Sequence, residues 1–170
     1  YVSMVAGAKW VDPDIKILFA LVGSWNDPTK AYELAQSQYN QGADVIWQVA
    51  GGSGLGVFEA AKDLNFYTMG TDVNQNGLDP DHIIASFIKN VDNAIYLGVQ
   101  TAAEGKFEGG TTYLGIKEGG MDMTWEGTNV SIPEAYQQKV LEAKEKIVSG
   151  EIVPPFSDED LTAYLTSIGQ

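Results

Sequence analysis

Apolar runs of strand length alternate along this chain with segments whose apolar residues recur at helical spacing. The predicted strands span residues 15–22, 44–49, 66–71 and 111–116. The predicted helices span residues 1–10, 28–42, 53–64, 79–105, 133–153 and 157–168. The run at 15–22 is almost wholly apolar, which indicates a strand covered on both faces of a sheet.

Helix-starting residues support several of these boundaries. Pro28 suits the first position of a helix, and Asp27 before it is a typical N-cap. Ser53 is predicted to cap the next helix, and Asp79–Pro80 to begin the one after it. The alternation of strand and helix is typical of βαβ units. We therefore predict an α/β fold with a doubly wound parallel sheet flanked by helices.

Three of the predicted strands end in a polar, Gly-rich or acidic turn. These turns are residues 23–28, 50–54 and 71–75. Ligands of open parallel sheets bind beyond the carboxyl ends of the strands, where such turns meet. Trp25, the Gly-rich backbone and Asp72 are therefore expected to face one small-molecule site.

The charge of the chain excludes some classes of partner. Its 170 residues suit one domain, and 23 acidic against 10 basic residues give a formal net charge of −13. Nucleic-acid binding needs a basic surface that displaces counterions from phosphate, and an anionic membrane surface would also repel this chain. We therefore predict no nucleic acid and no membrane surface as partner, and we interpret the acidity as a source of solubility.

The composition also limits the chemistry. The chain has no cysteine and one histidine, which excludes thiol nucleophiles, disulfides and metal sites built from Cys or His. Gly52 and Gly54 fit a dinucleotide fingerprint, but Val57 stands where its third glycine should be, and the Lys of a phosphate loop is absent. We therefore predict no metal and no cofactor.

Three of the candidates have both a structural and a functional interpretation. Gly51–Gly56 is a tight turn between strand and helix, or it offers backbone N–H groups to a ligand oxygen. Trp25 lies against the edge of the core, or it offers a flat surface for stacking. Lys89, on the helix predicted at 79–105, is a solvated or ion-paired residue, or its ammonium reaches a partner across a cleft.

Asp72 begins a segment that imitates the first half of a calcium-binding loop. Pro80 and Ile83 stand at the ninth and twelfth positions of that loop, where ligands should follow, so calcium is not expected. An Asp at the end of a strand can instead accept hydrogen bonds from sugar hydroxyls.

Five segments in register are similar to one known family: Gly23–Asp27, Gln41–Ile46, Ala50–Gly56, Gly70–Gln75 and Ser86–Asp92. With these segments the chain resembles the basic membrane lipoprotein family, whose members include the purine nucleoside receptors of bacterial ABC importers. The likeness extends from Tyr1 past Gly120 and into the helix predicted to begin at Pro133.

The resemblance implies one lobe of a periplasmic-binding-protein fold of type I, in which two lobes joined by three crossovers enclose the ligand. Residues 1–130 would form the C-terminal lobe, and the tail helices of residues 131–170 would pack toward an N-terminal lobe that is missing here. The implied ligand-binding residues are Trp25, Asp27, Gly51, Gly52, Asp72 and Lys89. Trp25 would lie against a nucleobase, and Gly51, Asp72 and Lys89 would contact the ribose.

By this resemblance the chain is expected to be the substrate-binding component of an ABC importer that binds a purine nucleoside or related metabolite without chemistry. The implied partners are the nucleoside-like ligand, an ABC permease, and a second copy of the chain through the surface left by the missing lobe. The intact protein is expected to be extracytoplasmic and lipid-anchored. The chain begins at Tyr1 without the anchoring cysteine or a signal peptide, so we interpret it as processed or shortened.

Two other classes of function are compatible with the residues. One is an enzyme on a doubly wound fold that uses Asp72 and Lys89, although the sequence shows no nucleophile with a partnered base. The other is an interaction module that self-associates through an apolar patch.

Overall fold

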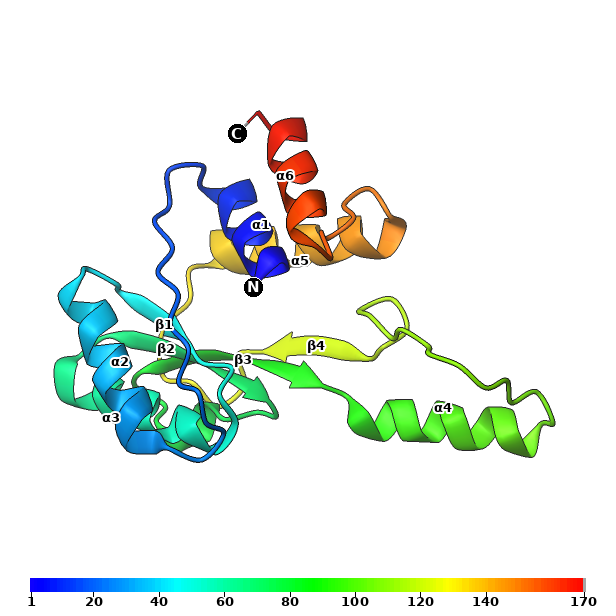
Figure 1. The fold of residues 1–170 in the computed structure, drawn as a ribbon, viewed down its shortest axis with the longest axis horizontal. Helices are drawn as coiled ribbons and strands as arrows, with labels where there is room; N and C mark the ends of the chain where they lie inside the picture. The colour runs from blue at the N-terminus through cyan, green and yellow to red at the C-terminus, as the bar shows by residue number, and fades with distance from the viewer. Residues whose placement is uncertain (170) are drawn as a thin grey trace. The chain divides into compact units, whose positions relative to one another are not determined.

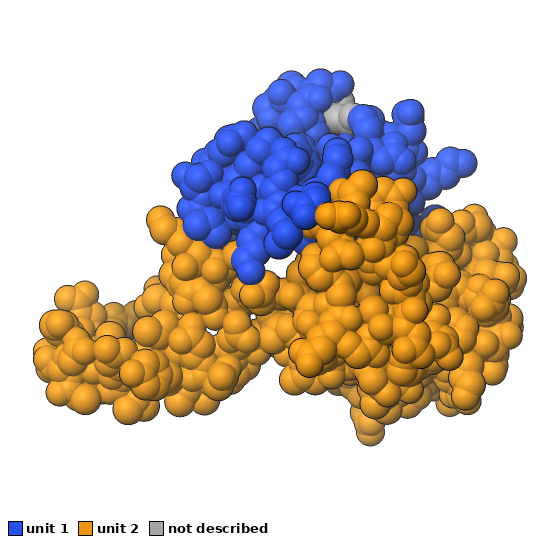
Figure 2. Space-filling view, turned by 180° about the vertical axis from the view of Figure 1, so that it is seen from behind, with its two compact units in different colours: residues 1–19, 138–170 blue, residues 20–137 orange. Residues whose placement is uncertain are grey.

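The computed structural model describes residues 1–169, and the chain divides into two compact units. Residues 20–137 form the sheet unit, and residues 1–19 with 138–170 form the helical unit (Figure 2). Among the described residues, no helix is both long enough and apolar enough to cross a lipid bilayer.

The sheet unit contains a mixed sheet and the helices that connect its strands. Its elements are, in order, α2 (Pro28–Asn40), β1 (Val45–Trp47), η1 (Gly51–Gly54), α3 (Leu55–Leu64), β2 (Tyr67–Asp72), η2 (Asn76–Leu78), β3 (Ile83–Lys89), α4 (Val91–Ala103) and β4 (Met121–Thr124). The strands lie in the order β1-β2-β3-β4, with β1, β2 and β3 parallel and β4 antiparallel to β3 (Figure 1). The predicted α/β fold with a largely parallel, helix-flanked sheet is confirmed.

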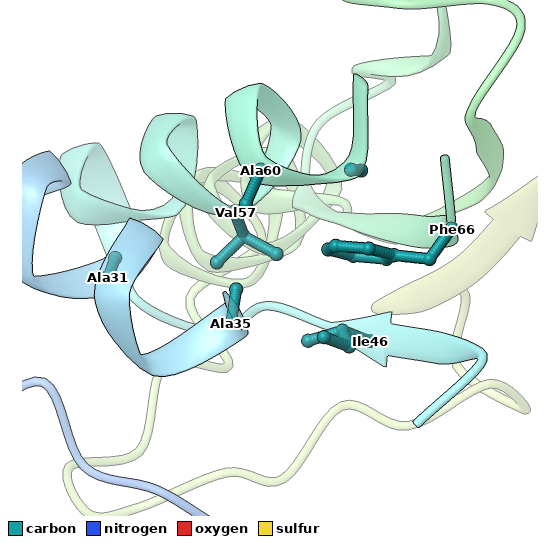
Figure 3. Packing of buried hydrophobic residues seen from close by; sticks show 7 residues of the cluster. Ala31, Ala35, Ile46, Val57, Ala60 and Phe66 are labelled. Atoms are coloured by element: carbon teal, nitrogen blue, oxygen red, sulfur yellow. The ribbon is translucent and has the colours of Figure 1, made fainter. Parts of the chain in front are cut away.

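The hydrophobic core of the sheet unit lies where the helix pair α2 and α3 packs on β1 (Figure 3). Its buried residues are Ala31, Ala35, Ile46, Val57, Ala60, Ala61 and Phe66. The alanines let the two helices approach each other closely. The approach is tightest at Gly56, where a Cβ atom would collide with the carbonyl oxygen of Pro28. The contact between α2 and α3 therefore depends on small residues, because protein interiors are close-packed and leave no room for larger side chains here.

The helical unit consists of α1 (Val2–Val11), most of α5 (Glu134–Ser149) and α6 (Asp158–Ser167). The hydroxyl of Ser3 donates a hydrogen bond of 2.7 Å to the carbonyl oxygen of Pro155, which ties α1 to the segment before α6. A capping box formed by Ser157 and Asp160 begins α6. The helices predicted in these regions are confirmed, with ends shifted by a few residues.

The strand predicted at residues 15–22 is wrong. These residues are irregular, because they connect the two units, whose boundary lies between Phe19 and Ala20. A segment that leaves one unit and enters another cannot keep backbone hydrogen bonds to a single sheet along its length. Val22, at the end of the segment, packs against the core of the sheet unit.

The helix predicted at residues 79–105 is wrong in its first half. Ile83–Lys89 is strand β3, and helix α4 begins only at Val91. The isoleucines of this run favour a strand, because β-branched side chains pack well on a pleated surface. β3 lies between β2 and β4 and carries apolar residues on both faces. A short apolar run without strict alternation cannot be told from helical spacing by its periodicity alone. Lys89 therefore ends a strand and does not lie on a helix.

The strand predicted at residues 111–116 is also wrong, and the last strand of the sheet is β4. The predicted segment is irregular and belongs to the return from α4 to the sheet (Figure 1). The glycine turn expected after it is present, since Gly119 has a φ of +70° and the N–H of Gly120 donates a 2.8 Å hydrogen bond to Gly115. Within residues 1–169, no strand of the sheet pairs with this segment.

Replacing Gly56 by Ala is expected to destabilise the sheet unit, because the new Cβ atom would collide with the Pro28 carbonyl and push α2 from α3. Overpacking of this kind costs about 1–3 kcal/mol. Urea unfolding followed by circular dichroism measures the change in the free energy of unfolding.

The matched control is Gly98→Ala on α4, where no atom lies within 4 Å of the added Cβ. There the substitution is expected to stabilise by about 0.4–1 kcal/mol, because it restricts the unfolded chain. A Gly56→Ala variant as stable as the Gly98→Ala variant would contradict the close packing of the two helices.

Candidate functional site

The parallel register brings the carboxyl ends of β1, β2 and β3 to one edge of the sheet unit. Each of the six predicted ligand-binding residues lies in a turn or at a strand end of this region. Trp25 and Asp27 precede α2, Gly51 and Gly52 follow β1, and Asp72 and Lys89 end β2 and β3.

Trp25 lies over the Gly-rich turn, and its indole is exposed. Its carbonyl oxygen accepts a 3.1 Å hydrogen bond from the N–H of Ser53. A Cβ atom at Gly51 would lie 3.3 Å from Cε3 of the indole, and one at Gly52 would lie 3.2 Å from the Trp25 carbonyl oxygen. This close approach favours glycine at both positions, and Gly51 also has a φ of +58°. Since 74% of Trp25 is exposed, the structure brings the three residues together and leaves an aromatic surface accessible.

Asp27 has a structural task in this turn. Its Oδ1 accepts a 2.9 Å hydrogen bond from the N–H of Lys30, so Asp27 is the N-cap of α2, as predicted. Its own N–H donates to the hydroxyl of Ser53 over 2.7 Å, and that hydroxyl donates to the carbonyl oxygen of Ser24 over 2.8 Å. Ser53 is fully buried and, through these hydrogen bonds, holds the turn of residues 23–28, the Trp25 turn, in place. The prediction that Ser53 caps α3 is wrong, because Gly54 occupies that position without a side-chain bond.

Asp72 and Lys89 form an ion pair across the ends of β2 and β3. Nζ of Lys89 lies 2.7 Å from Oδ1 of Asp72, and more than half of each side chain is exposed. An exposed pair of this kind adds only about 0–1 kcal/mol to stability. Asp72 also has a φ of +73°, a left-handed conformation that residues other than glycine adopt uncommonly. A charged and exposed residue in such a conformation is a candidate for ligand binding rather than for stabilisation.

The segment after Asp72 is a turn that attaches to the end of β4. The buried side-chain amide of Asn76 donates to the carbonyl oxygen of Glu126 over 2.9 Å, and that of Asn74 donates to the same oxygen over 3.1 Å. The side-chain oxygen of Asn76 accepts from the hydroxyl of Ser86 over 2.7 Å. These amides are thus engaged within the protein. Among residues 1–169, no group of three or more Asp, Glu, His or Cys residues could hold a metal ion.

Two glutamines that were not predicted as site residues connect the turns of this edge. Gln48 follows β1 and Gln75 follows β2, and Nε2 of Gln48 donates to Oε1 of Gln75 over 2.9 Å. Two glycines make room for them: a Cβ atom at Gly54 would collide with the carboxamide of Gln48, and one at Gly70 would lie 2.9 Å from Cβ of Gln75. Gln48 is a polar residue within an apolar run, and this is the signal in the sequence that could have indicated the contact.

Each unit also has a hollow in its surface. One, in the helical unit, is apolar and includes Trp10 and Tyr164. The other lies before β1 and β2, at the opposite ends of these strands, and includes Asp44 and Asn65. Trp25, Asp72 and Lys89 line neither hollow, and each is largely exposed.

Comparison with protein families places this arrangement in a known context. The family model described as "ABC transporter substrate-binding protein PnrA-like" matches residues 3–158. Basic membrane protein D of Borreliella burgdorferi is 36% identical over 156 residues, which cover 89% of this chain and 46% of that protein. The ABC transporter nucleoside-binding protein BmpA of Lactococcus lactis is 35% identical over 170 residues, covering 89% of this chain and 47% of that protein.

A solved structure shows the same fold. The solute-binding protein of an ABC transporter system from Aeropyrum pernix superposes with a TM-score of 0.76 at 27% identity, covering 96% of this chain and 57% of that one. The chain thus spans about half the length of the curated relatives it matches.

Replacing Asp27 by Ala is expected to remove the N-cap of α2 and to lower the free energy of unfolding by about 0.5–2 kcal/mol. Asp27→Asn is the matched variant, because its side-chain oxygen still accepts the N–H of Lys30 and should keep most of the stability. Urea denaturation of both variants tests this. Equal loss in the two variants would mean that charge, and not capping, is the contribution of Asp27.

Proposed function

Because the chain belongs to the family of PnrA-like substrate-binding proteins of ABC transporters, we propose that it binds a small molecule for import and performs no chemistry on it. In this role Asp72 and Lys89 contact the ligand, and neither acts as a catalytic acid or base. Their mutual ion pair supports this reading, because each charge already has a partner of opposite sign.

We propose that the ligand is a purine nucleoside. The observation that carries this proposal is that the exposed ion pair Asp72–Lys89 ends two parallel strands, while the exposed indole of Trp25 lies over the Gly-rich turn that follows the neighbouring strand β1. A nucleoside offers a planar base, which suits stacking on Trp25 at about 1–3 kcal/mol. It also offers ribose hydroxyls, which can donate to a carboxylate and accept from an ammonium. The name of the Lactococcus relative, a nucleoside-binding protein, points to the same class of ligand.

The chain is about half as long as its relatives, and we therefore propose that these residues supply one wall of the ligand site. In relatives about twice as long, the remaining half would supply the other wall. In the proposed assignment, residues 1–130 are the C-terminal lobe, and the helices of residues 131–170 pack toward the other lobe. The intact protein would be extracytoplasmic and lipid-anchored, and it would deliver its ligand to an ABC permease.

We also propose that a second copy of the chain is a partner. Helix α4 exposes the apolar side chains of Val91, Ile95 and Val99, each more than half accessible, and has no buried residue. Such a patch favours association in water. Sedimentation equilibrium is expected to show dimers at high protein concentration, and a strict monomer would contradict this part of the proposal.

Titration of the 15N-labelled chain with adenosine, guanosine and inosine tests the nucleoside proposal. We expect weak binding, with a Kd of roughly millimolar, because one wall supplies only part of the interaction energy and each lost 1.4 kcal/mol is about tenfold in affinity. Amide shift changes are expected at Gly51, Gly52 and Asp72 and at the indole of Trp25. Shift changes confined to other surfaces, or none at all, would contradict the proposed site.

Lys89→Met is expected to weaken nucleoside binding about tenfold or more, because a hydrogen bond from a charged group contributes about 1.5–3 kcal/mol. The matched control is Lys106→Met, which also breaks an exposed ion pair, 2.9 Å from Glu104. The control should bind nucleoside like the unaltered chain. Equal affinity of the two variants would remove Lys89 from the proposed site.

A further inference from the structure

We infer that Gln48 and Gln75 are positioning residues, which hold the turn that carries Asp72 in a fixed place relative to the Gly51–Gly52 turn. The role of these turns in binding rests on the proposed function. The arrangement of the turns is a property of the chain itself and can be measured without a ligand.

Gln48 provides the first half of the connection. It is buried, with 5% of its surface exposed. Its Oε1 accepts a 3.2 Å hydrogen bond from the N–H of Ala50, which directly precedes Gly51, and its Nε2 donates to Oε1 of Gln75 over 2.9 Å. The carboxamide of Gln48 therefore contacts the Gly-rich turn with one atom and Gln75 with the other.

Gln75 provides the second half. Its Oε1 also accepts a 2.8 Å hydrogen bond from the N–H of Thr71, which directly precedes Asp72. Because a backbone N–H can only donate, the side-chain atom that it meets must be oxygen, and this fixes the orientation of the carboxamide. The backbone N–H of Gln75 donates to the hydroxyl of Ser86 in β3 over 3.0 Å. Gln75 thus attaches the Asp72 turn to the strands on both sides of it.

The connection closes on itself through Thr71. The hydroxyl of Thr71 donates to the carbonyl oxygen of Gln48 over 2.6 Å and accepts from Nε1 of Trp47 over 2.8 Å. Gln48, Gln75 and Thr71 are therefore joined pairwise in a ring, so that none of the three can move alone. The ring spans the ends of β1 and β2.

A network of this kind sets geometry more than it adds stability. Exchanging hydrogen bonds with water for hydrogen bonds within the protein gains little, but a fully satisfied buried network specifies one arrangement. Among the described residues, no buried side-chain nitrogen or oxygen lacks a partner. Two of the bonds end on Ala50 and Thr71, the direct neighbours of Gly51 and Asp72. Apolar side chains of equal size would fill the space and leave the left-handed backbone of Asp72 unsupported.

Amide hydrogen exchange and chemical shifts of the free chain test this inference. Gln75→Met keeps the length of the side chain and removes both acceptor bonds, whereas Gln75→Glu keeps an acceptor oxygen. In Gln75→Met we expect the Thr71 amide to exchange roughly tenfold faster or more and the Cα and Cβ shifts of Asp72 to leave the left-handed range, while the amides of α3 keep their rates. Gln75→Glu should restore the Thr71 rate.

The matched control is Gln100→Met on α4, whose side chain bonds only to the exposed Glu104 in the contacts described and should leave Thr71 and Asp72 unchanged. Should Gln75→Met fail to fold, Gln48→Met tests the same connection, with the Ala50 amide as reporter. Unchanged Thr71 exchange and Asp72 shifts would overturn the inference, and so would faster exchange that includes α3, because it would indicate a general loss of stability. If the shifts move as expected but adenosine does not bind the unaltered chain, the proposed function fails and the positioning of the turn stands.

Discussion

The parallel pairing of β1, β2 and β3 is the constraint on which the candidate site depends. It places three strand ends at one edge, and the register that pairs Asp72 with Ile88 brings Asp72 next to Lys89. Small residues hold α2 and α3 on the sheet, and α3 in turn begins directly after η1, which carries the Gly-rich turn. The apolar core therefore fixes the strands, while polar contacts, through Ser53 and the two glutamines, fix the turns.

Much of the fold could be predicted from the sequence, and the errors have physical causes. Local signals sufficed where an element is determined by its own residues, as with Asp27 and Pro28 at the start of α2. They failed for β3, because a strand that is apolar on both faces lacks the alternation that separates strand from helix. They failed for residues 15–22 and 111–116, because a strand also needs a neighbour, and the neighbour is a property of the whole chain.

The structure brings candidate residues that were predicted from the sequence into contact in two groups, whereas the residues that support these groups were not predicted. Trp25, Gly51 and Gly52 lie together, and so do Asp72 and Lys89, as the strand-end pattern and the resemblance indicated. Gln48 and Gln75 were not predicted, because their partners are backbone atoms and each other, and this depends on register between strands. The glycines of the turn were only partly informative. Gly54 leaves space for the side chain of Gln48, and a sequence motif cannot distinguish such space from space for a ligand.

The Trp25 turn is held by its main chain, through the carbonyl oxygen that Ser53 contacts, and its indole extends largely into solvent. A change of side chain at this position therefore leaves the attachment of the turn intact, as exposed substitutions generally have small effects on folding. The attachment of the turn is thereby independent of which side chain residue 25 exposes. Chains built on this framework can exchange this surface residue while the architecture beneath it is conserved.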